Sequence, residues 1–561
     1  MKKTDFRVLY TSQGESLPEI PLNFYPRPAL VRNSFLCLNG KWDFSVGEAV
    51  YDRKIIVPYC PESALSGICE TVKPGTPVFY KRSFSLPENF NQGRIILHFG
   101  AVDCHCELSL NSKKIGTHSG GYDAFSFDVT GYILPENILE IKVWDDLDGA
   151  YPYGKQKVNR GGMWYTPVTG IWQTVWIESV PEKYVEKLDI DVDRQGATIT
   201  VTPSLEGVIF CEGKEYSLQN GKARIEPENP ESWSPENPRL YRFTLSAGED
   251  AVESYFALRT LEIKEFDGVK KLCLNGKPYF FHGVLGQGYF PDGIFTPADE
   301  KAFERDILSM KRLGFNTLRK HIKVEPQQFY YDCDRLGMIV FQDFVNNSDY
   351  NFIRDTALPT VGLQKLDDRK MHKKHREIFL SEAEKTIDQL KNHPCICYWT
   401  IFNEGWGQFD SANVYRRIRA LDPRRFIDST SGWFRCGESD VESIHVYFKP
   451  VKLKPSDRPL VLSELGGYSL TVKDHVSSSQ PYGYKTFGNS EELQAGLERL
   501  YRNEIIPAIK KGLCAAILTQ LSDVEDEING MVTYDRKVVK VNGEKMKKLA
   551  KEMQEEFSQL V

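Results

Sequence analysis

From about residue 263 the chain alternates short apolar runs with segments predicted as helices, and this restricts the possible folds more than any other feature. Eight runs resemble buried strands, at 280–285, 316–319, 338–343, 397–403, 426–428, 443–446, 458–464 and 515–520. The predicted helices lie at 300–313, 326–336, 367–392, 412–421, 491–511 and 543–560. Strands that alternate with helices form parallel sheets, and eight such repeats close into a barrel. The sequence therefore predicts a (β/α)8 TIM barrel over residues 263–561.

Two of the predicted strands carry a glutamate at the end, shortly before a glycine. The run 397–403 suits a strand buried on both faces, and it is followed by Glu404 and Gly405. The aliphatic run 458–464 ends in the same way at Glu464. Active sites of such barrels lie at the carboxyl ends of the strands, so both glutamates are expected to face one cavity. Two carboxylates on one rim are what glycoside hydrolysis requires.

The two glutamates are expected to have different roles. Glu404 is the candidate acid/base, and an apolar site or a nearby negative charge would keep it protonated at neutral pH. Glu464 is the candidate nucleophile and should stay ionised, with Arg319 at the end of the second strand as the neighbouring cation. The alternatives are that both glutamates are structural and that Arg319 forms an outer salt bridge.

Other polar and aromatic residues fall at or near predicted strand ends. Asn403 is expected to donate to a sugar 2-hydroxyl, although capping the strand is the alternative. The remaining candidate substrate-binding residues are Arg319, His321, Asp343, His445, Tyr447, Trp433, Gln287 and Gln520. Trp406 and Tyr468 are further candidate aromatic platforms for sugar rings, with a place in the core as the alternative for each aromatic residue.

The part before the barrel reads as β structure in two segments. Residues 1–181 contain short alternating runs separated by turn signals, which predicts a β-sandwich. Residues 182–262 continue the alternation over a length that suits a seven-strand immunoglobulin-like sandwich. The first sandwich is expected to support the barrel, and one of its loops is expected to reach the mouth of the pocket.

Composition excludes several classes of partner. A formal net charge of −6 gives no reason to expect nucleic acid or an anionic membrane as a partner. Asp5 and Arg7 interrupt the apolar start of the chain, which argues against a signal peptide and predicts a cytoplasmic location. Most of the 12 cysteines are expected to be free thiols, and the C-x-C pairs at 104–106 and 395–397 lack the spacing of zinc sites.

The ordered motifs resemble glycoside hydrolase family 2, the group of β-galactosidases, β-glucuronidases and β-mannosidases. The resemblance covers nearly the whole chain, through the segments 38–44, 80–82, 121–125, 164–173, 233–238, 274–277, 316–319, 403–404 and 463–464. It implies a jelly-roll, galactose-binding-like sandwich, an immunoglobulin-like domain and a TIM barrel. It also implies a retaining reaction through a covalent glycosyl-enzyme, with Glu404 as acid/base and Glu464 as nucleophile. No cofactor is expected, and no ligand cluster in the sequence supports a bound Mg²⁺ or Na⁺.

The sequence departs from the family pattern in ways that bear on the substrate. Residues 286–293 replace the asparagine-arginine-histidine-glutamate run of galactosidases, and no asparagine-x-lysine pair typical of glucuronidases follows Glu464. The eighth-strand tryptophan is also absent. A β-galactosidase-like exo-glycosidase for a neutral sugar is therefore predicted by elimination. β-Glucuronidase, β-mannosidase and α-L-arabinosidase activities stay open, as do a homo-oligomer and an inactive carbohydrate-binding protein.

Overall fold

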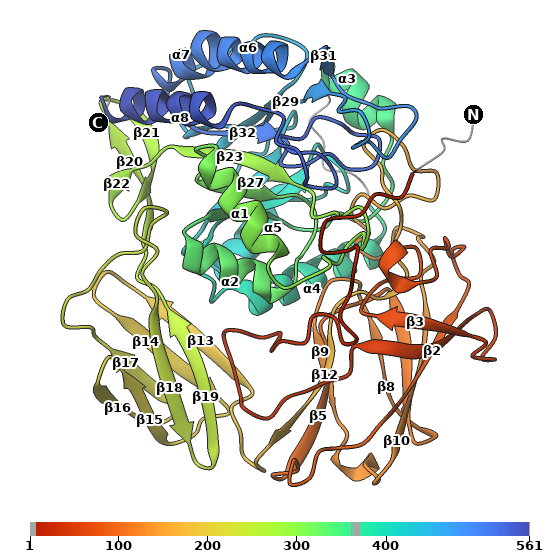
Figure 1. Cartoon of the computed structure of the whole chain (residues 1–561). Helices are drawn as coiled ribbons and strands as arrows, with labels where there is room; N and C mark the ends of the chain where they lie inside the picture. Colours follow the sequence, from red (N-terminus) through yellow and green to blue (C-terminus); the bar gives the residue numbers. More distant parts are fainter. Residues whose placement is uncertain (1–6, 361–362, 364–370, 560–561) are drawn as a thin grey trace.

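The computed structural model describes residues 7–360, 363 and 371–559, and it places two β-sandwiches side by side against a barrel (Figure 1). The predicted helix start at residue 367 lies outside the described residues. The same holds for the first six residues, on which part of the signal-peptide argument rests. The predicted order of β-sandwich, immunoglobulin-like sandwich and TIM barrel is confirmed. The domain boundaries at 181/182 and 262/263 stay predictions.

The N-terminal sandwich pairs a four-stranded antiparallel sheet, in the order β1-β12-β5-β9, with a six-stranded sheet, in the order β3-β2-β4-β10-β7-β8. Alternate residues of β10 point into the core, as period-2 patterning requires. The strands are β1 Leu36–Cys37, β2 Gly40–Val46, β3 Arg53–Val57, β4 Val78–Phe84, β5 Arg94–Phe99, β6 Val102–Asp103, β7 His105–Leu110, β8 Lys113–Ser119, β9 Phe125–Asp128, β10 Asn137–Trp144, β11 Gly170–Ile171 and β12 Val175–Val180.

The second sandwich has the seven strands expected of an immunoglobulin-like domain, in sheets of three and four strands. They are β13 Lys187–Val192, β14 Ala197–Thr202, β15 Gly207–Cys211, β16 Lys214–Leu218, β17 Lys222–Ile225, β18 Tyr241–Ala247 and β19 Asp250–Phe256. A separate core of aliphatic and aromatic side chains fills the space between the two sheets.

A small antiparallel sheet that the sequence did not predict precedes the barrel. It consists of β20 Leu261–Phe266, β21 Val269–Leu274 and β22 Lys277–Pro278. Its two tight turns are Asp267-Gly268 and Asn275-Gly276, and all four residues have positive φ. Asp-Gly and Asn-Gly pairs favour such hairpin turns, so a local signal for this sheet was present in the sequence.

The barrel contains all eight predicted strands as one parallel sheet in the order β27-β26-β25-β24-β23-β32-β29-β28. They are β23 Phe281–Gly286, β24 Thr317–Lys320, β25 Ile339–Asp343, β26 Ile396–Asn403, β27 Phe426–Ser431, β28 Glu442–Val446, β29 Leu460–Gly466 and β32 Leu513–Thr519. The two end strands β27 and β28 approach each other where Ser443 Oγ donates to the Thr430 carbonyl at 3.4 Å. The barrel is therefore nearly closed. The short strands β30 Tyr468–Leu470 and β31 Lys485–Phe487 lie outside it.

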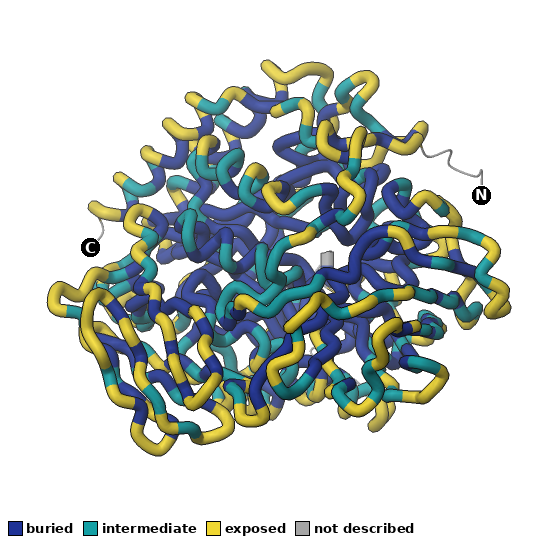
Figure 2. The backbone as a smooth tube through the Cα atoms, turned by 60° about the horizontal axis from the view of Figure 1, so that its bottom comes forward, coloured by how far each residue is buried: buried dark blue, intermediate teal, exposed yellow. Residues whose placement is uncertain are grey.

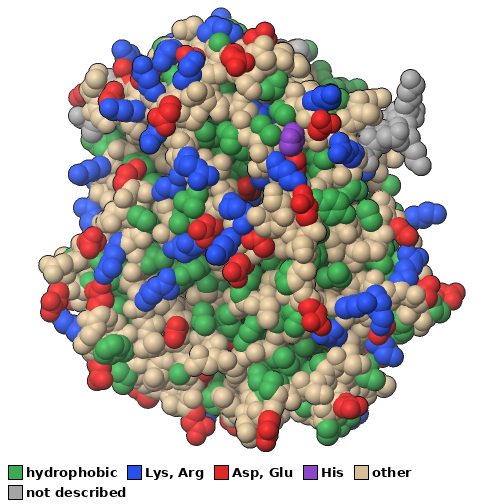
Figure 3. Space-filling model, viewed as in Figure 1, with side chains coloured by type: hydrophobic (Ala, Val, Ile, Leu, Met, Phe, Trp, Pro, Cys, Tyr) green, Lys and Arg blue, Asp and Glu red, His purple; other side chains and the backbone are tan. Residues whose placement is uncertain are grey.

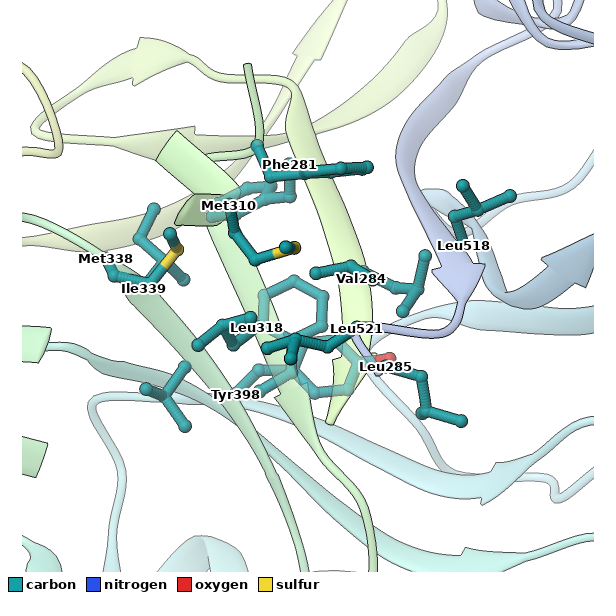
Figure 4. Packing of buried hydrophobic residues seen from close by; sticks show 14 of the residues in the cluster. Phe281, Val284, Leu285, Met310, Leu318, Met338, Ile339, Tyr398, Leu518 and Leu521 are labelled. Atoms are coloured by element: carbon teal, nitrogen blue, oxygen red, sulfur yellow. The ribbon is translucent and has the colours of Figure 1, made fainter. Parts of the chain in front are cut away.

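Large side chains fill the barrel, and many of its residues are buried (Figure 2). Phe341 stacks on Tyr398 with ring centroids 4.2 Å apart, and Phe281 lies 5.4 Å from Phe341. Figure 4 shows Phe281, Tyr398 and aliphatic side chains from neighbouring strands in this cluster. Such packing fixes the strands, and hence the side chains at their carboxyl ends.

Helices cover the barrel, and one of them differs from the prediction. The α-helices are α1 Ala302–Arg312, α2 Gln327–Leu336, α3 Leu358–Thr360, α4 Lys373–Leu390, α5 Ser411–Leu421, α6 Ser490–Leu500, α7 Ile506–Ile509 and α8 Gly543–Ser558. The predicted helix 491–511 is interrupted by a π-helical turn, Tyr501–Ile505. Pro507 lies two residues after this turn and has no N–H to donate, which accounts for the break in the α-helical pattern. Short 3₁₀ turns occur at Ala64–Ser66 and Thr130–Tyr132, and a second π turn occurs at Ile353–Ala357.

Acidic and basic side chains are interspersed over the face of the molecule seen in Figure 3. Among the helices in the described ranges, none combines the length and the apolar character that crossing a lipid bilayer requires.

Candidate active site

Glu404 directly follows β26 and has an unusual backbone conformation. Its φ is 52°, in the left-handed region that non-glycine residues rarely adopt, and Gly405 follows with φ 69°. Such a conformation costs about 1–3 kcal/mol and is concentrated at functional sites. A Cβ at Gly432 would lie 3.3 Å from Cγ of Glu404 and 3.1 Å from His445, so glycine at position 432 leaves room for both side chains.

Glu464 lies in β29 and is held by hydrogen-bond donors. Arg319 Nη1 donates to its Oε1 at 3.1 Å, and the Tyr447 hydroxyl donates to Oε2. Burial alone would raise the pKa of Glu464, but the nearby His445 and Arg319 charges and the Tyr447 hydrogen bond lower it to about 2. Glu464 is therefore an ionised carboxylate at neutral pH.

The two glutamates face each other across His445. His445 Nδ1 lies 2.8 Å from Oε1 of Glu404 and 3.6 Å from Oε2 of Glu464. One carboxylate oxygen of Glu404, one of Glu464 and a ring nitrogen of His445 all lie within 4.8 Å of one another. The two carboxylates are thus close enough to contact opposite sides of one sugar ring.

Arg319 orients the polar groups around Glu464. Its Nε donates to Asp343 at 3.0 Å and its Nη2 donates to Asn403 Oδ1 at 2.9 Å. Burial opposes ionisation of Asp343, but the Arg319 charge and the His321 hydrogen bond hold the pKa of that carboxyl below its usual value. His321 Nδ1 lies 2.8 Å from Asp343, and burial lowers the pKa of the imidazole. Arg319 is 1% exposed, which fits a central support better than an outer salt bridge.

Two polar atoms of this group are left without a partner. The Asn403 amide nitrogen, a donor, and His321 Nε2, an acceptor when Nδ1 donates to Asp343, have no hydrogen-bond partner among the residues that the structure describes, although both residues are buried. Free polar atoms beside paired carboxylates suit sugar hydroxyls.

The remaining candidates lie at the same end of the barrel but differ in their contacts. Tyr447 joins Glu464 to Thr519 Oγ1, which lies 2.9 Å from its hydroxyl, and the Trp433 ring lies 5.8 Å from the His445 ring. Gln287 and Gln520 follow β23 and β32, yet within the described ranges neither hydrogen-bonds to the glutamates. Trp406 is 2% exposed between other rings and Tyr468 packs on Phe487 at 5.2 Å, so both belong to apolar packing.

The β10–β11 loop, residues 145–169 of the N-terminal sandwich, reaches the carboxyl end of the barrel. Trp164 packs on Trp406 with centroids 5.1 Å apart, and the Thr166 amide donates to Glu525 at 2.9 Å. The same loop carries Lys155, which is 8% exposed and has no carboxylate within 4 Å in the described part of the chain. Its Nζ lies 5.8 Å from the Trp164 ring. The sequence predicted that a loop would reach the pocket but did not identify Lys155.

Lys155 acts electrostatically on the site. Burial raises the pKa of Glu527, and the positive charge of Lys155 counteracts this rise. Burial also lowers the pKa of His321, and Lys155 adds to this effect. Lys155 therefore lies close enough to act electrostatically on His321, which follows β24, and on Glu527, which lies after β32.

In the described part of the chain, two groups of side chains have the spacing of metal ligands. They are Glu404 with His445 and Glu464, and Asp103 with Cys104 and Asp145 in the N-terminal sandwich. A cation in the first group would occupy oxygens that the paired carboxylates need for reaction with a sugar. The second group lies in the N-terminal sandwich, and no hydrogen bond among the described residues joins it to either glutamate.

Three family descriptions match consecutive parts of the chain. "Glycosyl hydrolases family 2, sugar binding domain" matches residues 64–181, "Glycosyl hydrolases family 2" matches 187–259, and "Glycosyl hydrolases family 2, TIM barrel domain" matches 263–510. The order is the same as that of the two sandwiches and the barrel.

Two β-galactosidases are among the similar sequences. The protein of Thermoanaerobacter pseudethanolicus is 25% identical over 376 residues, 61% of this chain and 46% of the relative. That of Kluyveromyces lactis is 25% identical over 414 residues, 62% of this chain and 39% of the relative. The chain thus spans less than half the length of these relatives.

Solved structures share the whole architecture. A β-D-glucuronidase from Dictyoglomus thermophilum has a TM-score of 0.73 and 18% identity, covering 95% of this chain and 98% of that one. A β-galacturonidase from Eisenbergiella tayi, bound to galacturonate, has a TM-score of 0.67 and 18% identity, covering 94% and 98%. At this identity the likeness shows the fold alone. On the three matched domains in their order, the chain belongs to glycoside hydrolase family 2.

Proposed function

We propose that the protein is a retaining exo-β-glycosidase that hydrolyses terminal glycosidic bonds by double displacement. The observation that supports this best is the approach of a Glu404 oxygen and a Glu464 oxygen to within 4.8 Å. Carboxyl groups about 5–5.5 Å apart are typical of retaining enzymes, whereas about 6.5–9.5 Å is needed for inversion. Little room is left between these carboxylates for the attacking water of an inverting enzyme.

In the first step the ionised Glu464 attacks the anomeric carbon. The bond from that carbon to the aglycone oxygen breaks, and Glu404 gives its proton to the departing oxygen. Arg319 and Tyr447 hold the attacking carboxylate in one orientation. Asn403 donates to the sugar through the amide nitrogen that Arg319 leaves free.

In the second step Glu404 removes a proton from water, which attacks the anomeric carbon of the glycosyl-enzyme. The ester bond to Glu464 breaks and the carboxylate is restored. Two displacements give overall retention. The reaction uses no cofactor.

The β-galactosidase relatives support a neutral galactose-like sugar as the glycone. A uronic acid is the second candidate. Lys155 favours it, because a buried lysine that has no carboxylate partner among the described residues suits the sugar carboxylate. Structural neighbours named as a β-glucuronidase and a β-galacturonidase are consistent with this second candidate.

Location and assembly are part of the same proposal. We place the protein in the cytoplasm, with a carbohydrate as substrate and with neither nucleic acid nor membrane as partner. Self-association into a homo-oligomer is compatible with this function.

A panel of aryl β-glycosides tests the proposal. Release of the aryl alcohol from at least one neutral glycoside or uronide is expected, and NMR of the first-formed sugar should show the β anomer. An α anomer as first product would overturn retention. Sugar binding without any turnover would favour the catalytically inactive carbohydrate-binding protein instead.

A further inference from the structure

A cavity of about 310 Å³ lies between the immunoglobulin-like sandwich and the barrel, away from the two glutamates. The sandwich side of its wall is formed by β13 and by the segment 256–262, which leads from β19 into β20. The barrel side is formed by residues 391–394 and 423–425, which directly precede β26 and β27. The cavity is therefore at the amino ends of these strands, opposite to the end that carries Glu404.

Arg259 is a buried cation of this wall that lacks an anionic partner among the residues the structure describes. It is 7% exposed, and its closest polar contact is from Nη1 to Cys397 Sγ at 3.7 Å. Among the described residues, Nε has no hydrogen-bond partner and no carboxylate lies within 4 Å of the guanidinium. Burial is the largest effect that lowers the pKa of Arg259, and the charges of Arg425 and Arg424 act in the same direction. A charge in this position is costly unless a counter-ion is present.

The other charged residues of the wall are already paired. Arg425 is bound to Asp422 at 2.6 Å and to backbone carbonyls, and Arg424 is bound to Asp191 at 2.8 Å. Lys391 pairs with Asp189, and Glu262 pairs with Arg194 and Lys264 at 2.6 Å each. Within the described ranges Arg259 is thus the one cation of the wall that lacks a carboxylate.

Thr260, the neighbour of Arg259, lines the same cavity and carries a second unsatisfied polar group. Its Oγ1 is buried and has no hydrogen-bond partner among the described residues. A hydroxyl donor beside a guanidinium fork, in a cavity with further basic residues, suits an oxyanion that accepts several hydrogen bonds.

We propose that this cavity binds a small phosphate-bearing anion, either inorganic phosphate or a phosphorylated sugar, through Arg259 and Thr260. The planar guanidinium matches two oxygens of a phosphate, and a third oxygen can accept from the threonine hydroxyl. Phosphate fits better than a carboxylate, because it offers more acceptor oxygens for the guanidinium and the hydroxyl together. This site does not depend on the proposed glycosidase reaction.

Isothermal titration calorimetry of the full chain with inorganic phosphate and with glucose 6-phosphate tests the site. Saturable one-to-one binding of at least one of the two is expected, with sodium chloride at equal ionic strength as the blank. Arg259→Met should weaken binding at least about ten-fold, since a hydrogen-bonded charge pair is lost. The matched control Arg53→Met, in the N-terminal sandwich and paired with Glu70, should bind like the unaltered protein.

The two ligands distinguish the sources of the anion. Equal affinity for both means that the phosphate group alone is recognised, and tighter binding of glucose 6-phosphate means that a phosphorylated sugar is the ligand. If Arg259→Met does not fold, Thr260→Val should still weaken binding several-fold. The inference is overturned if neither ligand binds, if Arg259→Met or Thr260→Val binds undiminished, or if a sugar that occupies the active site displaces the anion.

Discussion

His445 Nδ1 lies 2.8 Å from the carboxylate of Glu404, and the same imidazole nitrogen lies 3.6 Å from Glu464. The acid/base candidate is thus positioned by a side chain from β28, which also borders the nucleophile candidate. Because Glu404 has a strained backbone as well, its orientation depends on both the end of β26 and its contact with β28.

Glu404→Ala should discriminate between leaving groups. Hydrolysis of alkyl glycosides should fall by about 10²–10⁴-fold, because their oxygen must be protonated as it departs. Dinitrophenyl glycosides should lose far less in their first step, since that leaving group is stable as an anion. Single-turnover rates for a series of leaving groups measure this. An equal loss across the series would contradict the acid role of Glu404.

Glu464→Ala should lose roughly 10⁴-fold or more of the activity, as expected for the loss of a covalent nucleophile. Added azide then attacks the substrate directly, and the glycosyl azide should have inverted configuration. In Glu404→Ala azide instead attacks the glycosyl-enzyme, so the azide product should have retained configuration. NMR of the two products assigns the roles, and identical configurations would refute the assignment.

The barrel and its two glutamates were predictable because both depend on local patterns. A strand buried on both faces reads as an apolar run, and a glycine shortly after it marks its end, as Gly405 does after Glu404. The alternation of strands and helices implies the strand order, and this order brings Phe281, Phe341 and Tyr398 together inside the barrel.

Features that depend on docking between domains were not predictable. Lys155 meets the barrel through the β10–β11 loop, whose position is set by contacts such as that of Thr166 with Glu525, more than 300 residues away in the chain. The pairing state of Arg259 likewise emerges only when the immunoglobulin-like sandwich meets the barrel. No periodicity in the sequence indicates that Lys155 or Arg259 would lack a carboxylate partner.

The low pKa of Glu464 predicts a specific acid sensitivity. A carboxyl whose pKa falls from 4.5 to about 2 on folding stabilises the protein above pH 4.5, and this contribution is lost as the pH falls towards 2. Between pH 7 and pH 3 the loss should be about 2 kcal/mol. Glu464→Gln lacks this component, so urea unfolding should show the unaltered protein losing more stability than the variant over that range.

Glu48→Gln, at an exposed position of the N-terminal sandwich, is the matched control for the unfolding measurements. It should follow the unaltered protein at every pH. If Glu464→Gln also follows it, the carboxylate is not held ionised by its neighbours.

Lys155→Met should separate the two candidate glycones. If the substrate is a uronide, kcat/KM for the aryl uronide should fall by about 10–100-fold, because the sugar carboxylate loses its charged donor. Activity on a neutral aryl glycoside should change little.

Two further variants serve as controls for this prediction. Lys155→Arg should restore part of the uronide activity. Lys142→Met alters a half-buried lysine over Trp144 in the same sandwich and should behave like the unaltered protein. A uniform loss on both substrates, with a lowered Tm, would assign Lys155 to domain docking. If the protein prefers neutral sugars both before and after the substitution, the galactose-like glycone is supported. That result would not contradict the retaining mechanism.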